Sequence, residues 1–190
     1  VRSLVRATAV AAVEFDWVTE TARHVGTVVH RELQRYARES GALPSSEAER
    51  DAVQRRYAAE LAELGVPYER RNAAVAKTLE AVRRTLEDER GRWLLDASHA
   101  SAQSELALTG VVDNGLVSIV IDRTFLDATG MRWIVDYKTS SHEGAGLDDF
   151  LDNERERYRA QLERYAQLMQ ALGNEPIRLG LYFPLLSGWR

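Results

Sequence analysis

The sequence contains no cysteine. This absence excludes disulfide bonds and metal sites built from thiolates, and it fits a protein that works in a reducing cytosol. No apolar run approaches the ~20 residues that a membrane-spanning helix needs. The first residues also lack an apolar segment followed by a small-residue cleavage site. We therefore expect a cytoplasmic protein with neither a membrane span nor a signal peptide.

The chain also lacks an excess of basic residues, since 25 Lys and Arg stand against 29 Asp and Glu, for a net charge of -4. Proteins that bind nucleic acid on their own usually carry a basic surface, because neutralising phosphates supplies much of the affinity. The charge balance weighs against tight autonomous DNA binding, but not against chemistry on DNA that another domain delivers. No Gly-rich phosphate loop followed by Lys and Ser or Thr occurs, so ATP hydrolysis is not expected of this chain.

The chain is long enough for one domain with a hydrophobic core, and its 45% hydrophobic and 28% charged residues are typical of globular proteins. Helical periodicity predicts three helices in the first half, over about residues 21–39, 46–65 and 69–89. Ser46 and Glu49 have the spacing of a capping box at the start of the second helix. Gly91 is expected to end the third. Residues 1–20 show no clean period.

Shorter alternating segments predict strands in the second half. We expect strands over about residues 105–112, 116–126, 131–139 and 177–186. A fourth helix, capped by Asp148 or Asp149 and ending near 172–173, precedes the last strand. This order predicts a single domain over residues 1–190, with a helical lobe over about 1–90 packed on an α/β core over about 91–190. Because neither end looks like a natural terminus, we expect a fragment of a larger protein.

A hairpin in the second half brings acidic residues together. If Thr129 is the centre of a three-residue loop, Asp122 and Asp136 lie directly opposite each other on one face, and Lys138 shares that face. Gly130 would supply the positive φ that such a loop needs, although a bulge there could shift the register by one residue.

Two carboxylates facing each other across a ladder repel, and the apolar residues before each of them make ionisation costlier still. A divalent cation removes this conflict, and Mg²⁺ prefers oxygen ligands. A lysine beside the metal could then orient or deprotonate a water and offset developing negative charge. The pattern therefore indicates a hydrolytic metal site on Asp122, Asp136 and Lys138.

The same residues also allow a structural interpretation. Asp122 could pair with Arg123 or with a distant arginine, and Lys138 could form an ion pair with Asp136 at an exposed edge. Spacing alone leaves both interpretations open.

Four blocks of sequence resemble those of a known family. These blocks are Gly26–Leu33, Ile121–Arg123, Ile134–Thr139 and Gln161–Tyr165, which read GTVVHREL, IDR, IVDYKT and QLERY. In this order they resemble the PD-(D/E)XK nuclease superfamily and, more narrowly, the RecB-type nuclease domain at the C-terminus of bacterial RecB and AddA helicase–nuclease subunits. The resemblance covers about residues 23–186 and implies a restriction-endonuclease-like mixed β-sheet flanked by helices.

The resemblance implies a role for each matching residue. Metal ligands would be His30, Asp122, Asp136 and the backbone carbonyl of Tyr137. Asp122, Asp136 and Lys138 would form the catalytic centre, with Lys138 as the catalytic lysine. Without the resemblance, a lone histidine such as His30 is more often structural than a ligand.

Further residues would contact the substrate. The resemblance places Gln161 and Tyr165 on the substrate side of the site, and their spacing of four puts them on one helix face. Tyr165 fits a core stripe equally well. Arg157 and Arg164 lie close to the same side and could contact phosphates. Glu105 lies where related proteins often carry an acidic residue, which is a looser match.

The function that the resemblance implies is Mg²⁺-dependent hydrolysis of DNA phosphodiester bonds, with Mn²⁺ able to substitute. The chain would be an exonuclease V-type nuclease in double-strand break repair and recombination in the bacterial cytoplasm. Its DNA, expected to be single-stranded, would come from a helicase motor domain of the same polypeptide, with further subunits possible. The alternatives are a non-catalytic DNA-guiding or docking module, and an endonuclease of the restriction or mobile-element kind.

Overall fold

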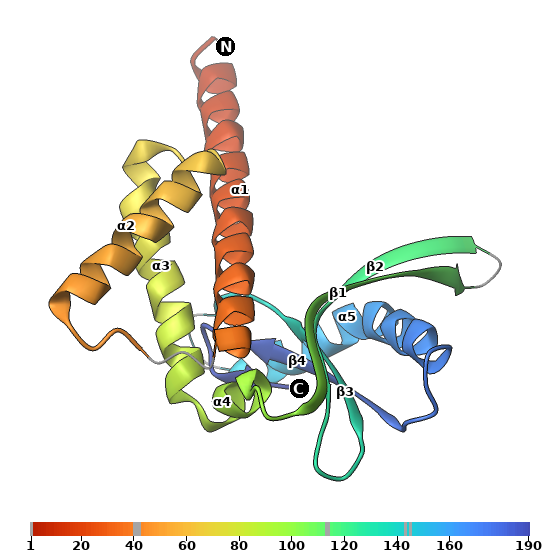
Figure 1. Ribbon diagram of the computed structural model, residues 1–190. Coiled ribbons are helices and arrows are strands. Elements are labelled where there is room, and N and C mark those ends of the chain that lie inside the picture. The colour runs from red at the N-terminus through yellow and green to blue at the C-terminus, as the bar shows by residue number, and fades with distance from the viewer. Residues whose placement is uncertain (1, 40–42, 113–114, 143, 145) are drawn as a thin grey trace. The chain divides into compact units, whose positions relative to one another are not determined.

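The computed structural model describes residues 2–39, 43–112, 115–142, 144 and 146–190, and for residues 2–19 only the backbone (Figure 1). The chain divides into two compact units, one of Val1–Val29 and Pro44–Glu80 and the other of His30–Leu43 and Ala81–Arg190. All the residues that the sequence nominates for the site lie in the second unit. Among the residues described, no helix combines the length and apolarity needed to cross a bilayer.

The first unit is helical. It contains the first part of α1 (Arg2–Glu39), all of α2 (Glu47–Glu63) and the first part of α3 (Tyr68–Glu87). The prediction that the first helix starts near residue 21 was wrong, because it begins at Arg2. No glycine or proline occurs before Gly26, so nothing in this segment breaks a helix even though its apolar residues lack a period.

The start of α2 confirms the predicted capping box. The Ser46 side chain accepts a hydrogen bond from the Glu49 backbone N–H, and the Glu49 carboxylate accepts one from the Ser46 backbone. These reciprocal bonds satisfy two of the donors that a helix start leaves unpaired.

The third helix does not end at Gly91. α3 ends at Glu87, and a short helix, α4 (Glu89–Leu95), follows after Asp88, whose side chain accepts from the Gly91 N–H. A Cβ at Gly91 would lie 2.1 Å from the Thr85 carbonyl oxygen. The glycine therefore permits close approach to α3 instead of ending a helix.

The second unit contains a mixed sheet, as predicted, and the sheet has five strands where the sequence predicted four. Its order is β1-β2-β3-β4-β5, over Ala100–Val112, Gly115–Leu126, Arg132–Tyr137, Ile177–Phe183 and Gly188–Trp189. All neighbouring pairs are antiparallel except β3 and β4, which are parallel because α5 (Leu147–Gln170) connects them. Three details were wrong: β1 begins five residues earlier than predicted, β5 was not predicted, and Gly146 precedes α5 without any side-chain cap from Asp148 or Asp149.

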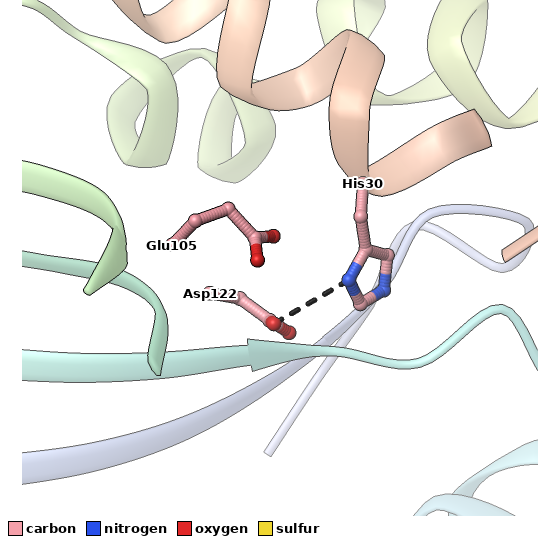
Figure 2. A group of neighbouring side chains, drawn as sticks. All are labelled: His30, Glu105 and Asp122. Carbon is pink, nitrogen blue, oxygen red and sulfur yellow. Dashed lines mark ion pairs between the residues drawn. The ribbon is translucent and has the colours of Figure 1, made fainter. Parts of the chain in front are cut away.

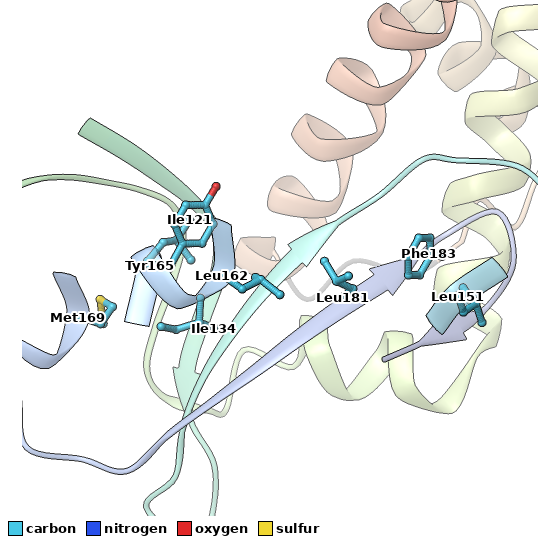
Figure 3. Close-up of a cluster of buried hydrophobic side chains, with 8 residues drawn as sticks. All are labelled: Ile121, Ile134, Leu151, Leu162, Tyr165, Met169, Leu181 and Phe183. Atoms are coloured by element: carbon cyan, nitrogen blue, oxygen red, sulfur yellow. The ribbon is translucent and has the colours of Figure 1, made fainter. Parts of the chain in front are cut away.

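The hydrophobic core of this unit lies between the sheet and α5 (Figure 3). The sheet contributes Ile121, Ile134, Leu181 and Phe183, and α5 contributes Leu151, Leu162, Tyr165 and Met169. The helix residues recur at spacings of three, four, seven and eleven, which is the stripe of an amphipathic helix. Because this stripe fixes the rotation of α5, it also fixes where the polar side chains at its border point.

Candidate active site

The β2–β3 hairpin has the register predicted from the sequence. Its ladder pairs Leu126 with Arg132 and continues to Arg123 opposite Val135. Gly130 closes the loop with φ at +79°. The next pair in this register would be Asp122 and Asp136, but the ladder ends one step before them. The two acids therefore lie where the strands separate.

Asp122 turns its carboxylate to the backbone of the neighbouring strand. Its Oδ2 accepts a hydrogen bond of 2.7 Å from the Tyr137 N–H. Arg123 does not neutralise it, because that guanidinium donates to the carbonyls of Leu94 and Asp96. The alternative in which Asp122 pairs with Arg123 was therefore wrong.

Asp136 is more deeply buried than Asp122. Its Oδ1 accepts from Gln161 Nε2 at 2.9 Å, and its Oδ2 lies 2.6 Å from Lys138 Nζ. Apart from this contact with Lys138, Oδ2 has no hydrogen-bond partner among the described residues. The side chains of Lys138 and Asp136 are 17% and 5% exposed, so the pair is not at an exposed edge. Burial, and then the charge of Asp122, raise the pKa of Asp136 to about 6 despite the lysine.

His30, on α1, lies between Asp122 and the end of β3. Its Nε2 is 3.1 Å from the Tyr137 carbonyl oxygen, and its Nδ1 is 3.4 Å from Asp122 Oδ1. Burial by itself lowers the pKa of His30, but the hydrogen bond to Asp122 and the nearby carboxylates outweigh burial and raise it. The surroundings of this imidazole therefore favour a positive charge.

Glu105 completes the acidic group from β1. His30, Glu105 and Asp122 each place a ligand atom so that all three atoms lie within 4.8 Å of one another, and Figure 2 shows the three side chains pointing toward a common space. Burial, and then the charge of Asp122, raise the pKa of Glu105. Its backbone has φ at +53°, in the left-handed region. The structure thus gives Glu105 a closer place in the site than the sequence indicated.

The donor atoms of this group suit a hard divalent cation. Carboxylate and carbonyl oxygens are the ligands that Mg²⁺ and Mn²⁺ prefer. The His30 ring and the Tyr137 carbonyl oxygen lie together at the end of β3, where both could serve as ligands. Asp136 Oδ2, whose partner among the described residues is Lys138, is a further oxygen that could bind the cation.

Gln161 and Tyr165 border the carboxylates from α5. The Gln161 side-chain N–H groups donate to Asp136 and to the Tyr165 hydroxyl. Tyr165 is buried in the hydrophobic cluster, so it serves the core while its hydroxyl reaches the site. Their role toward a substrate stays a prediction.

The two arginines nominated for phosphate contact lie on the exposed surface of α5. Arg157 forms an ion pair with Glu154 at 3.2 Å, and Arg164 is exposed. Tyr158 is a further residue beside the site that the sequence did not single out. Lys138 Nζ lies 3.9 Å from the centroid of the Tyr158 ring. Tyr158 lies three residues before Gln161 on the same helix, and this spacing could have indicated that it lies near the site.

His30 from α1, Asp122 and Asp136 from the β2–β3 hairpin and Lys138 just after β3 form a group of side chains that could hold a divalent cation. A sequence model of the PD-(D/E)XK nuclease superfamily matches residues 7–186. The chain therefore belongs to the PD-(D/E)XK nuclease superfamily, and its five-stranded sheet flanked by helices is the restriction-endonuclease-like fold expected of it. Among curated proteins, no sequence matches significantly.

Proposed function

We propose that this chain is the nuclease domain of a RecB/AddA-type helicase–nuclease and hydrolyses DNA phosphodiester bonds with Mg²⁺ or Mn²⁺. The observation that carries the proposal is the convergence of His30, Asp122, Asp136 and the Tyr137 carbonyl beside a partly buried Lys138. These residues come from three of the four sequence blocks that resemble that family. Superfamily membership supports the nuclease chemistry, and the ordered blocks support the narrower assignment.

The residues that would hold the metal are His30, Asp122, Asp136 and the Tyr137 carbonyl, with Glu105 as a further acidic neighbour. A bound divalent ion polarises a phosphoryl oxygen and lowers the pKa of a coordinated water. Each ligand is already oriented by a neighbour. The Tyr137 N–H fixes Asp122, and Gln161 fixes one oxygen of Asp136. Such supporting hydrogen bonds commonly tune metal affinity and activity.

Lys138 supplies positive charge at the reacting group. Its ammonium contacts Asp136 Oδ2 and could equally approach a phosphate oxygen placed beside that carboxylate. In this position it stabilises the negative charge that develops on the phosphoryl oxygens as the bond to the leaving oxygen breaks. The lysine ammonium would also donate a hydrogen bond that orients the attacking water.

The substrate in this proposal is single-stranded DNA delivered by a motor domain of the same polypeptide, in double-strand break repair and recombination in the bacterial cytoplasm. The net charge of -4 supports delivery, because a domain with few excess cations binds phosphates weakly on its own. The site then needs only local contacts with the scissile group.

Cleavage of end-labelled DNA tests the proposal. Linear single-stranded, linear double-stranded and circular single-stranded DNA are each incubated with Mg²⁺, Mn²⁺ or EDTA. We expect cleavage of linear single strands that requires metal and is lost in Asp136→Asn but retained in Glu163→Gln, which changes an exposed acid of α5. Cleavage that survives Asp136→Asn refutes the mechanism. Absence of both cleavage and metal binding favours the non-catalytic docking module.

A further inference from the structure

The ammonium group of Lys138 contacts two partners of different kinds. On one side Nζ lies 2.6 Å from Asp136 Oδ2, and on another it lies 3.9 Å from the centroid of the Tyr158 ring. A cation within about 6 Å of an aromatic face is attracted by the ring quadrupole, more strongly where water is excluded. The Lys138 side chain is 17% exposed, so this contact is largely shielded from water.

The Tyr158 ring is itself held in place. It packs against the hydrophobic cluster between α5 and the sheet, and the Arg157 guanidinium lies 5.3 Å from its centroid. Arg157 is tied to the buried Glu154, whose carboxylate also accepts from the Ser140 hydroxyl in the segment after β3. The ring therefore presents a fixed face to Lys138.

The two partners of Lys138, Asp136 and Tyr158, differ in whether they can also bind a metal ion. In the proposed function Asp136 shares its charge with a divalent ion, which weakens its hold on the lysine. The face of Tyr158 cannot ligate a hard cation through oxygen, so it keeps its contact with the ammonium. We propose that Tyr158 is a positioning residue whose ring holds Lys138 at the reacting group while Asp136 serves as a metal ligand. This role rests on the proposed nuclease function.

A graded series of phenylalanine analogues tests the contact. Tyr158 is replaced in the full chain by Phe and by its mono-, di- and trifluorinated forms, which withdraw charge from the ring face with little change in size. Phe should retain most of the wild-type kcat. From Phe to the trifluorinated form kcat should fall progressively, by about tenfold in all, while KM stays unchanged. A flat series, with wild-type cleavage still dependent on Asp136, overturns the role of Tyr158 and leaves the nuclease function standing.

Tyr68 provides the matched control. Its ring lies on α3 beneath the Arg71 guanidinium, 5.7 Å from its centroid, and it is exposed. The same analogues at Tyr68 should leave kcat unchanged. A comparable fall at both positions would show that fluorination acts through general stability and would overturn the proposal.

A double-mutant cycle tests the same contact without any cleavage. Unfolding of metal-free wild type, Lys138→Met, Tyr158→Leu and the double variant is compared in denaturant. The two changes should couple by about three- to tenfold in the unfolding equilibrium constant. Additive effects would overturn the proposal. Coupling in a chain that neither cleaves DNA nor binds Mn²⁺ would leave the contact intact and refute the nuclease function instead, so the two failures are distinguishable.

Discussion

The backbone N–H of Tyr137 donates to Asp122 Oδ2 at 2.7 Å, so the strand that carries one acid of the site also orients the other. The carbonyl of the same residue faces His30 Nε2 at 3.1 Å. The backbone of Tyr137, at the end of β3, thus contacts both Asp122 on β2 and His30 on α1. Small shifts of this backbone are expected to alter the whole group of ligands together.

The raised pKa of Asp136 predicts a pH-dependent gain in stability for Asp136→Asn. Because the folded pKa is about 6 and the ordinary value is 3.8, the acid contributes most stability below pH ~4 and loses it as the pH rises through 6. The metal-free variant should therefore be more stable than wild type at pH 7.5, by about 1–3 kcal/mol, with no difference near pH 4. Urea unfolding in EDTA at both pH values measures this.

Glu163→Gln is the control for this comparison and should change stability little at either pH, because Glu163 is exposed on α5. A variant Asp136→Asn that is less stable than wild type at pH 7.5 would show that the Lys138 ion pair outweighs burial and repulsion.

Gln161 is predicted to act through Asp136. Gln161→Glu removes the donor to Asp136 Oδ1 and places a second negative charge beside it, whereas Gln161→Leu removes only the hydrogen bond. Loss of such a supporting contact costs about 10- to 100-fold in activity or metal affinity. We expect single-turnover cleavage to fall by this factor in Gln161→Leu and further in Gln161→Glu. Equal rates for wild type and Gln161→Glu would refute the role.

Gly91 is predicted to be intolerant of a methyl group. Gly91→Ala would place Cβ 2.1 Å from the Thr85 carbonyl oxygen and 2.8 Å from the Tyr182 hydroxyl. Forcing extra volume into a packed site costs about 1–3 kcal/mol. Chemical denaturation should show this loss in Gly91→Ala. The matched variant Gly115→Ala, where the nearest atom is 3.5 Å away, should unfold near the wild-type midpoint. Similar stabilities for both variants would contradict the packing.

Much of the hairpin could be predicted because its determinants are local. A loop centred on Thr129, with Gly130 at positive φ, sets the pairing of residues 123–126 with residues 132–135. The helix stripe of α5 likewise follows from its own sequence, so the position of Gln161 beside the core followed as well. In both cases the relevant periodicity lies within one or two adjacent segments.

Other features depend on contacts between distant segments and could not be predicted. Glu105 has a left-handed backbone conformation within β1, and because the residue is not a glycine the sequence did not indicate that conformation. The stacking of Lys138 on Tyr158 requires the packing of α5 on the sheet. The break between α3 and α4 depends on Asp88, which caps α4, whereas the sequence predicted that the third helix ends at Gly91 with no helix directly after it.

The central claim is that His30, Asp122, Asp136 and the Tyr137 carbonyl form a divalent metal site. Titration calorimetry with Mn²⁺ on the wild-type chain tests it most directly, beside His30→Ala, Asp136→Asn and the control Glu163→Gln. We predict that wild type and Glu163→Gln bind Mn²⁺ with equal affinity and that each site variant binds at least about tenfold more weakly. Equal affinity in all four proteins, or no binding by the wild type, would contradict the assignment.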